Sequence, residues 1–245
     1  MKILVCITHV PDTTSKINFT TNNTKFDSNG VQFIIGPYDD YALARAVELK
    51  ETSNATVTVL NVGLAETEPT LRKALAIGAD DAVRINADPA DAFYVAYQIA
   101  QYARPIGFDL ILMGRESIDH NGGVVHGLVG ELLGIPSLSP VMKLDIEGTH
   151  AKLAREIEGG KEILEANLPL VAGCQEPIAE WKIPNMRGIM SARTKPLVVV
   201  EPASVDSGVK LQKFELPSPK GSVRMISADN VSELVSLLKN EAKIL

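Results

Sequence analysis

The stretch D-L-I-L-M-G-R-E-S-I-D-H-N-G-G-V-V, residues 109–125, contains a strand, a loop and the start of a helix. Its first five residues include a short apolar run, which is typical of a strand buried on both faces of a sheet. Gly114 ends this strand, and after a polar loop Gly122 and Gly123 lead into a helix that continues to Leu133. A strand-loop-helix unit of this kind predicts an α/β fold with a parallel sheet.

Similar units precede this stretch. Strands are predicted at residues 2–7, 56–62 and 82–85, and helices from Gly36-Pro37, over residues 69–77, and from Asp88-Pro89 to about Tyr102. Asp39 and Asp40 lie in the first turn of the first helix, where carboxylates favour the positive end of the helix dipole. Residues 12–29, rich in Thr and Asn, predict a small hairpin or an irregular loop. The alternation predicts right-handed crossovers and a mostly parallel sheet with helices on both faces.

The pattern changes after Pro136. Antiparallel strands are predicted over residues 141–145, 151–157 and 161–167, and a further strand over residues 170–174. In R-E-I-E-G-G-K-E, residues 155–162, Gly159-Gly160 can take the positive φ angles of a tight turn, which predicts a charged surface hairpin. Residues 176–195 lack periodicity, and residues 197–201 are predicted to be extended. A proline-rich linker then leads to an amphipathic helix, one face of which carries Val231, Leu234, Val235, Leu238 and Ala242. This tail predicts an arm that wraps a partner, or a helix that packs on its own domain.

Composition excludes several classes of protein. The 245 residues are 45% hydrophobic, as in an ordinary globular protein, and the net charge of -6 without a basic stripe argues against nucleic-acid binding. No apolar run approaches the roughly 20 residues of a membrane span, and the apolar start of the chain is too short for a signal peptide. Cys6 and Cys174 predict buried free thiols, and the histidines lack metal-site spacing. We expect a cytoplasmic protein.

Ligands of open α/β sheets bind beyond the carboxyl ends of the strands. Three such ends carry suggestive residues: Cys6 to Thr8, Val62-Gly63, and residues 114–125, here named the glycine loop. The two glycines and the helix start after them favour an anion such as phosphate. Asp119 and Asn121 could hold the loop by local side-chain hydrogen bonds or bond a ribose hydroxyl, or they could be turn formers in a plain connecting loop. His126 could face the phosphate, but a helix-surface position is favoured. Walker and nucleophile-elbow patterns are missing, so the loop predicts holding of a nucleotide, not its cleavage.

Several separated motifs, in one order, resemble a known family. They are V-P-D at residues 10–12, T-L-R-K-A-L-A-I-G-A-D at 70–80, G-R-E-S-I-D at 114–119, R-E-I-E-G-G-K-E-I-L at 155–164 followed by Leu168-Pro169, and G-I-M-S-A-R-T-K-P at 188–196. Over almost its full length the chain is similar to the small (beta) subunits of electron transfer flavoproteins. Two stretches depart from the pattern: D-H-N-G-G-V replaces D-x-D-T/C-x-Q after residue 118, and fewer lysines follow G-I-M.

The resemblance implies a Rossmann-like, adenine nucleotide alpha hydrolase-like fold and an electron carrier without bond-making chemistry of its own. A larger alpha subunit would complete a heterodimer whose FAD is held mainly by alpha. Electrons would pass from acyl-CoA or related dehydrogenases to a quinone-reducing acceptor. The beta subunit would hold a structural AMP or, in electron-bifurcating members, a second FAD. The alternative is a stand-alone nucleotide-binding protein of the universal-stress type that shares the fold alone.

The resemblance also implies site residues. The nucleotide pocket would be formed by Cys6, Gly36, Pro37, Tyr38, Asp39, Val62, Gly114, Arg115, Glu116, Ser117, Ile118, Asp119, His120, Asn121, Gly122, Gly123, Val124 and Val125. Tyr38 would also approach the alpha-bound flavin. Residues 176–195, here named the docking loop, would bind the dehydrogenase through Met186, the preferred anchor, or Ile183.

Domain organisation follows from the same resemblance. Residues 1–195 would form the nucleotide-binding domain, which includes the docking loop. Residues 196–245, here named the arm, would pack on the partner subunit.

Overall fold

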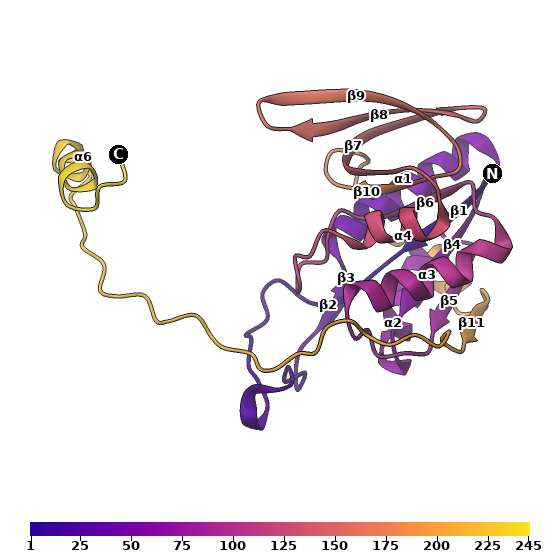
Figure 1. Cartoon of the computed structure of the whole chain (residues 1–245), viewed down its shortest axis with the longest axis horizontal. Helices are drawn as coiled ribbons and strands as arrows, with labels where there is room; N and C mark the ends of the chain where they lie inside the picture. Colours follow the sequence, from indigo (N-terminus) through magenta and orange to yellow (C-terminus); the bar gives the residue numbers. More distant parts are fainter.

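A nine-stranded sheet in the order β11-β5-β4-β1-β6-β10-β7-β8-β9 forms the centre of the molecule (Figure 1). The computed structural model describes residues 1–245, except the side chain of Thr21. The strands are β1 Lys2–Cys6, β4 Thr56–Val62, β5 Asp81–Ile85, β6 Leu110–Gly114, β7 Ser137–Glu147, β8 His150–Ile157, β9 Gly160–Asn167, β10 Leu170–Cys174 and β11 Leu197–Val200. Neighbours from β11 to β7 are parallel, and β7, β8 and β9 pair antiparallel. The predicted parallel sheet and antiparallel extension are confirmed.

Helices cover both faces of the parallel part. The helices are α1 Pro37–Ser53, α2 Glu68–Ile77, α3 Ala92–Ile106, α4 Val125–Leu133, α5 Met186–Ala192 and α6 Val231–Asn240, with short 3-10 turns η1 Thr21–Asn23 and η2 Ala65–Thr67. Side chains of α1, α2 and α5 join one core cluster, and those of α3 and α4 join the other. Because neighbouring strand residues face opposite ways, Val5 belongs to the first cluster and Leu4 to the second.

Some predicted boundaries were wrong. Helix α3 begins at Ala92, not at residue 88, because the Asp91 side chain caps it by accepting a hydrogen bond from the Tyr94 N–H. In the hairpin only Gly159 has a positive φ, of 81°, since Gly160 already pairs with Ile157 as the first residue of β9. The docking loop, predicted to be irregular, contains α5. Residues 12–29, predicted as a small hairpin or an irregular loop, lie between the antiparallel strands β2 His9–Pro11 and β3 Phe33–Ile35, which were not predicted.

The arm starts inside the sheet and ends away from it. Strand β11 pairs with β5, so the sheet continues past residue 195, while the division into two domains there stays a prediction. Farther along, the Ala203 N–H and C=O bond the Gln98 side chain, and the Phe214 ring stacks on Phe19 at 4.7 Å. Beyond this contact the chain runs out to α6, which lies apart from the body with none of its described side chains buried (Figure 1). The helix does not pack on its own domain.

The order of connections marks one place on the sheet. Strand β1 lies between β4 and β6. The chain after β1 passes through α1 to β4, whereas the chain after β6 passes through α4 to β7 on the other side of the sheet. In open α/β sheets such a switch of direction opens a crevice at the carboxyl ends of the two strands.

Candidate functional site

The carboxyl ends of β1 and β6 meet the first turn of α1 at the Asp39 side chain. One carboxylate oxygen accepts hydrogen bonds from the Thr8 N–H at 2.8 Å and the Thr8 hydroxyl at 2.6 Å, and the other accepts from the Gly114 N–H at 2.7 Å. Asp39 is only 3% exposed, and its burial raises the pKa of the carboxyl to about 6, although these donors act in the opposite direction. Asp39 therefore joins three segments of the site, a role that goes beyond the expected interaction with the helix dipole.

Cys6 and Val62 end their strands at the same edge of the sheet, but both side chains lie in the core. Burial raises the pKa of the Cys6 and Cys174 thiols, and both cysteines are free and buried, as predicted. The side chains of Cys6 and Val62 therefore contribute to the core. Protonated, enclosed thiols are also poor nucleophiles.

The glycine loop is the exposed part of the site. Residues 115–118 are partly exposed and residues 119–124 are exposed, and a Cβ on Gly122 would meet no atom within 4 Å. The Ser117 hydroxyl donates to Asp119 at 2.6 Å, and the Asn121 N–H donates to the Ser117 carbonyl at 2.8 Å. Asn121 and Gly123 have positive φ angles of 49° and 60°. Local hydrogen bonds hold the loop, as expected for Asp119, whereas Asn121 contributes its backbone.

Helix α4 begins at the end of this loop. Its N-cap residue is Val124, and no described side chain caps the first turn. Uncapped N–H groups at a helix N-terminus, next to small and exposed residues, suit an anion. The residues present thus fit the phosphate of a nucleotide. The acidic Glu116 nearby is paired with Arg115 at 2.9 Å.

His126, expected on the surface of α4, is half-buried. Its ring nitrogen Nδ1 lies 3.4 Å from the Ser137 hydroxyl, which donates to the His126 carbonyl at 3.0 Å. The ring packs close to Gly173 of β10, and burial lowers the pKa of the imidazole. The surface interpretation was wrong because it ignored the strands that α4 covers.

Arg115 connects the loop to neighbouring elements. Its guanidinium carbon lies 4.8 Å from the centroid of the Tyr38 ring, and one guanidinium nitrogen donates to Gln175 at 3.1 Å. Gln175 was missed in the sequence because it simply follows a buried strand. One signal could have pointed to Gln175 in the sequence: it lies directly before the docking loop, at the carboxyl end of β10.

The docking loop presents apolar side chains on a fixed base. Ile183 and Met186 are each 73% exposed. The Asn185 side chain caps α5 by accepting from the Gly188 N–H at 2.8 Å. From α2, Arg72 donates to the carbonyls of Ala192 and Lys195 at 2.8 and 2.7 Å, which fixes the end of the loop.

Comparison with known proteins agrees with the motifs. Residues 24–205 match the electron transfer flavoprotein domain family. The chain belongs to the electron transfer flavoprotein family. Over the full chain it is 37% identical to the electron transfer flavoprotein subunit beta of Bacillus subtilis, all of which is covered, and 32% identical to that of Syntrophomonas wolfei, 98% covered. The human subunit beta is 29% identical, with 99% covered.

These likenesses extend beyond the fold to the whole length of the beta subunits. The role of this electron transfer flavoprotein chain is therefore that of a beta subunit in electron transport that involves a flavin. Sequence identity over the full length is more than a shared fold, and a shared fold was the only basis of the stand-alone nucleotide-binding alternative. No helix in the described part of the chain is long and apolar enough to cross a membrane.

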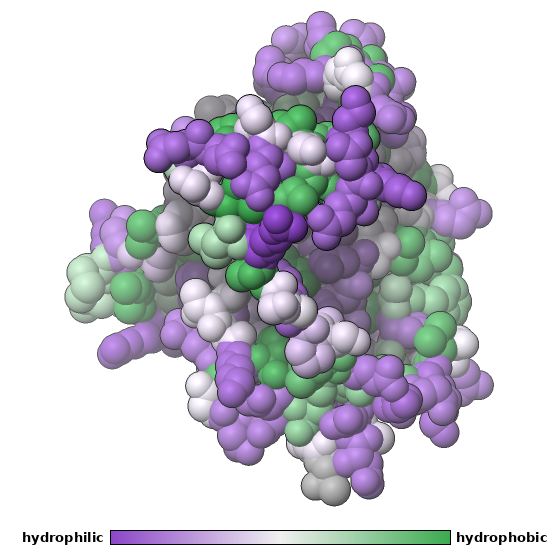
Figure 2. All heavy atoms as spheres, turned by 90° about the vertical axis from the view of Figure 1, so that its left-hand side faces the viewer, coloured by the Kyte–Doolittle hydropathy of each residue, from purple (hydrophilic) through white to green (hydrophobic). Residues whose placement is uncertain are grey.

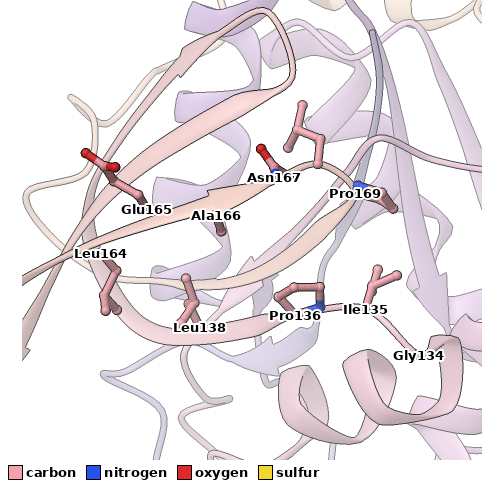
Figure 3. A pocket seen from close by; sticks show the side chains of 10 residues that line it. Gly134, Ile135, Pro136, Leu138, Leu164, Glu165, Ala166, Asn167 and Pro169 are labelled. Atoms are coloured by element: carbon pink, nitrogen blue, oxygen red, sulfur yellow. The ribbon is translucent and has the colours of Figure 1, made fainter.

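A hollow of about 530 Å³ lies at the end of the sheet away from the glycine loop. Figure 3 shows the residues that line it. It is lined by Gly134, Ile135, Pro136 and Leu138 before and within β7, and by residues 164–169 at the end of β9 and before β10. These are the amino ends of β7 and β10, whereas the glycine loop follows the carboxyl end of β6. In this electron transfer flavoprotein chain the hollow is thus separate from the candidate nucleotide site.

Proposed function

We propose that this chain binds a larger alpha subunit and that the heterodimer carries FAD, held mainly by alpha. The complex takes electrons from acyl-CoA or related dehydrogenases and passes them to a quinone-reducing acceptor. The chain itself makes and breaks no bonds in a substrate. Family membership over the full length is the observation that carries this proposal.

The beta subunit holds an adenine nucleotide at the crevice beside β1 and β6. The uncapped start of α4 and the open Gly122 and Gly123 support this, because they offer free N–H groups and space to a phosphate. The backbone at Cys6, Val62 and Gly36 to Asp39 completes the pocket. If the bound nucleotide is AMP, it would supply charge and packing that hold the loop. It would supply no redox chemistry.

The identity of the nucleotide separates two kinds of complex. AMP is expected in a simple electron carrier, whereas a second FAD in this chain would make the protein an electron-bifurcating member. The purified complex is denatured, and the released nucleotides are separated and quantified. AMP beside FAD supports the structural role, and FAD alone at twice the amount supports bifurcation. Release of FAD alone in an amount equal to the complex would contradict a nucleotide site in the glycine loop.

The dehydrogenase binds at the docking loop, with Met186 as its anchor. The exposed, unbranched Met186 side chain beside polar neighbours suits insertion into an apolar pocket of a partner. Substituting Met186→Ala is expected to slow electron uptake roughly tenfold, because a buried anchor contributes on the order of 1–2 kcal/mol to binding. Flavin content should not change.

Two matched substitutions complete this experiment. Ile163→Ala removes an exposed apolar side chain, 58% exposed, from strand β9 outside the docking loop and should leave the rate of uptake unchanged. Ile183→Ala measures the alternative anchor. Normal rates for Met186→Ala with a slow Ile183→Ala variant would move the anchor to Ile183.

A further inference from the structure

Strand β6 and helix α1 approach closely at Gly114. A Cβ at this position would lie 2.7 Å from the Cβ of Tyr38, so only glycine allows the contact. The approach is fixed by the Gly114 N–H, which bonds Asp39 next to Tyr38. As a result, the side chain of the following residue, Arg115, reaches the Tyr38 ring.

Arg115 makes three interactions with a single planar group. Its guanidinium carbon is 4.8 Å from the Tyr38 ring centroid, within the range of a cation–π contact. One nitrogen donates to Gln175 at 3.1 Å and another to Glu116 at 2.9 Å. Because Glu116 offsets the positive charge, the main effect of Arg115 is to fix geometry.

Gln175 holds Arg115 from the other side. Its amide nitrogen donates to the Glu156 carboxylate at 2.7 Å, so its oxygen faces the Arg115 donor. Gln175 is only 7% exposed, and its backbone N–H donates to the Val141 carbonyl at 3.0 Å. A side chain with both an acceptor and a donor is required here, since Arg115 only donates and Glu156 only accepts.

We infer that Arg115 is a positioning residue that holds the Tyr38 ring in one place and joins it, through Gln175, to the base of the docking loop. This inference rests on the proposed function, in which Tyr38 approaches the alpha-bound flavin. A ring held between β6 and α1 gives the flavin a constant neighbour, and the Arg115 clamp (Tyr38, Arg115, Gln175 and Glu156) maintains it. Protein groups beside a flavin tune its electronics, so a change in the position of the Tyr38 ring would change the flavin midpoint potential.

The decisive variant is Arg115→Lys. Lysine keeps the positive charge but lacks the planar fork that stacks on Tyr38 while bonding two side chains. In complexes with the alpha subunit purified to equal FAD content, we expect a shift of the flavin midpoint potential and a changed visible circular dichroism of the flavin. Arg155→Lys is the matched control: Arg155 is paired with Glu162 at 2.5 Å and has a similarly exposed side chain. Among the described residues, no hydrogen bond or cation–π contact joins it to Tyr38 or Gln175.

A double-mutant cycle shows whether the effect passes through the ring. Arg115→Lys is repeated in a Tyr38→Leu background, where the clamp predicts that the substitution no longer shifts the potential. An equal shift in both backgrounds, an unchanged potential in Arg115→Lys, or the same shift in Arg155→Lys would overturn the inference. If Arg115→Lys fails to assemble, Glu156→Gln at the exposed end of the clamp should give a smaller shift, and no shift there would count against it.

Failure of the proposed function has a different signature. A wild-type chain that forms no flavin-containing complex would contradict the beta-subunit proposal before any variant is compared. If the wild-type complex binds flavin normally and the Arg115→Lys complex has the same flavin spectrum and midpoint potential, the clamp alone is contradicted.

Discussion

At the scale of single residues, Asp39 does most to assemble the site. Its two oxygens accept three hydrogen bonds, from both donors of Thr8 and from the Gly114 N–H. These bonds bring the end of β1, the end of β6 and the start of α1 together. Because the group is buried, every donor left without an acceptor would carry a full desolvation cost.

Substituting Asp39→Asn is expected to lower the free energy of unfolding by about 2 kcal/mol. The amide keeps one oxygen, but its NH2 group must face the N–H of Gly114 or the donors of Thr8. Urea denaturation measures the loss. Asp206→Asn, at an exposed position in the arm, serves as the control and should change stability little. Equal stabilities of both variants would show that Asp39 does not hold the three segments.

The penalty of Asp39→Asn should also depend on pH. Burial raises the pKa of Asp39 to about 6, above the value of about 4 in the unfolded chain. Between these values the folded state binds more protons, so this carboxyl makes the free energy of unfolding fall as the pH rises. The asparagine lacks this dependence. The difference between wild type and variant should therefore be larger near pH 4.5 than near pH 7, and the opposite order in urea denaturation would contradict the assignment.

At the scale of elements, the glycine loop depends on one backbone conformation. Gly123 has a φ of 60°, while Gly122 is not among the residues with positive φ. A Cβ at Gly122 would meet no atom within 4 Å, and a Cβ at Gly123 would make only ordinary contacts at 3.9 Å. The two neighbours therefore separate the effect of backbone conformation from the effect of added bulk.

Gly123→Ala is expected to lower the free energy of unfolding by about 1 kcal/mol, because the left-handed conformation is strained for alanine. It should also reduce the nucleotide that remains bound after purification. Gly122→Ala is the matched control for stability, since it adds the same methyl group without this strain. If both variants unfold at the same urea concentration, the positive φ of Gly123 is not what shapes the loop.

Several elements could be predicted from the sequence because their signals are local. The apolar runs of β1 and β6 predicted buried strands, and the glycines after β6 predicted the start of α4. Partners distant in the chain could not be predicted in this way. Strand β11 pairs with β5 more than 100 residues earlier, and Gln175 acquires its role only when the sheet places it beside Arg115 and Glu156. Likewise, the sequence indicates for Asp39 only an acidic residue in the first turn of a helix, because Thr8 and Gly114 contact it only in the folded protein.

At the scale of the whole molecule, an α/β body carries an arm that leaves its surface (Figure 1). Contacts with the body reach Phe214, and none of the described side chains in residues 217–245 is buried. Val231, Val235 and Leu234 of α6 are exposed, together with Val223 and Met225 before it. On the side where α6 lies, apolar side chains are visible among polar ones (Figure 2). A row of exposed apolar side chains of this kind fits a partner surface.

Deletion of residues 217–245 should therefore leave the body folded but abolish the complex with the alpha subunit. The free energy of unfolding should change by less than about 1 kcal/mol, because no buried side chain is removed. Urea denaturation and size-exclusion chromatography of the truncated chain with the alpha subunit measure the two effects. A truncated chain that still forms the complex would show that the arm is not needed for assembly.

The most direct measurement of the central claim is co-purification of the full chain with the alpha subunit, followed by mixing with an acyl-CoA dehydrogenase and its substrate. We predict a heterodimer whose bound flavin is reduced by the dehydrogenase, with a second adenine nucleotide retained. A chain that stays monomeric beside the alpha subunit and turns over ATP would contradict the account.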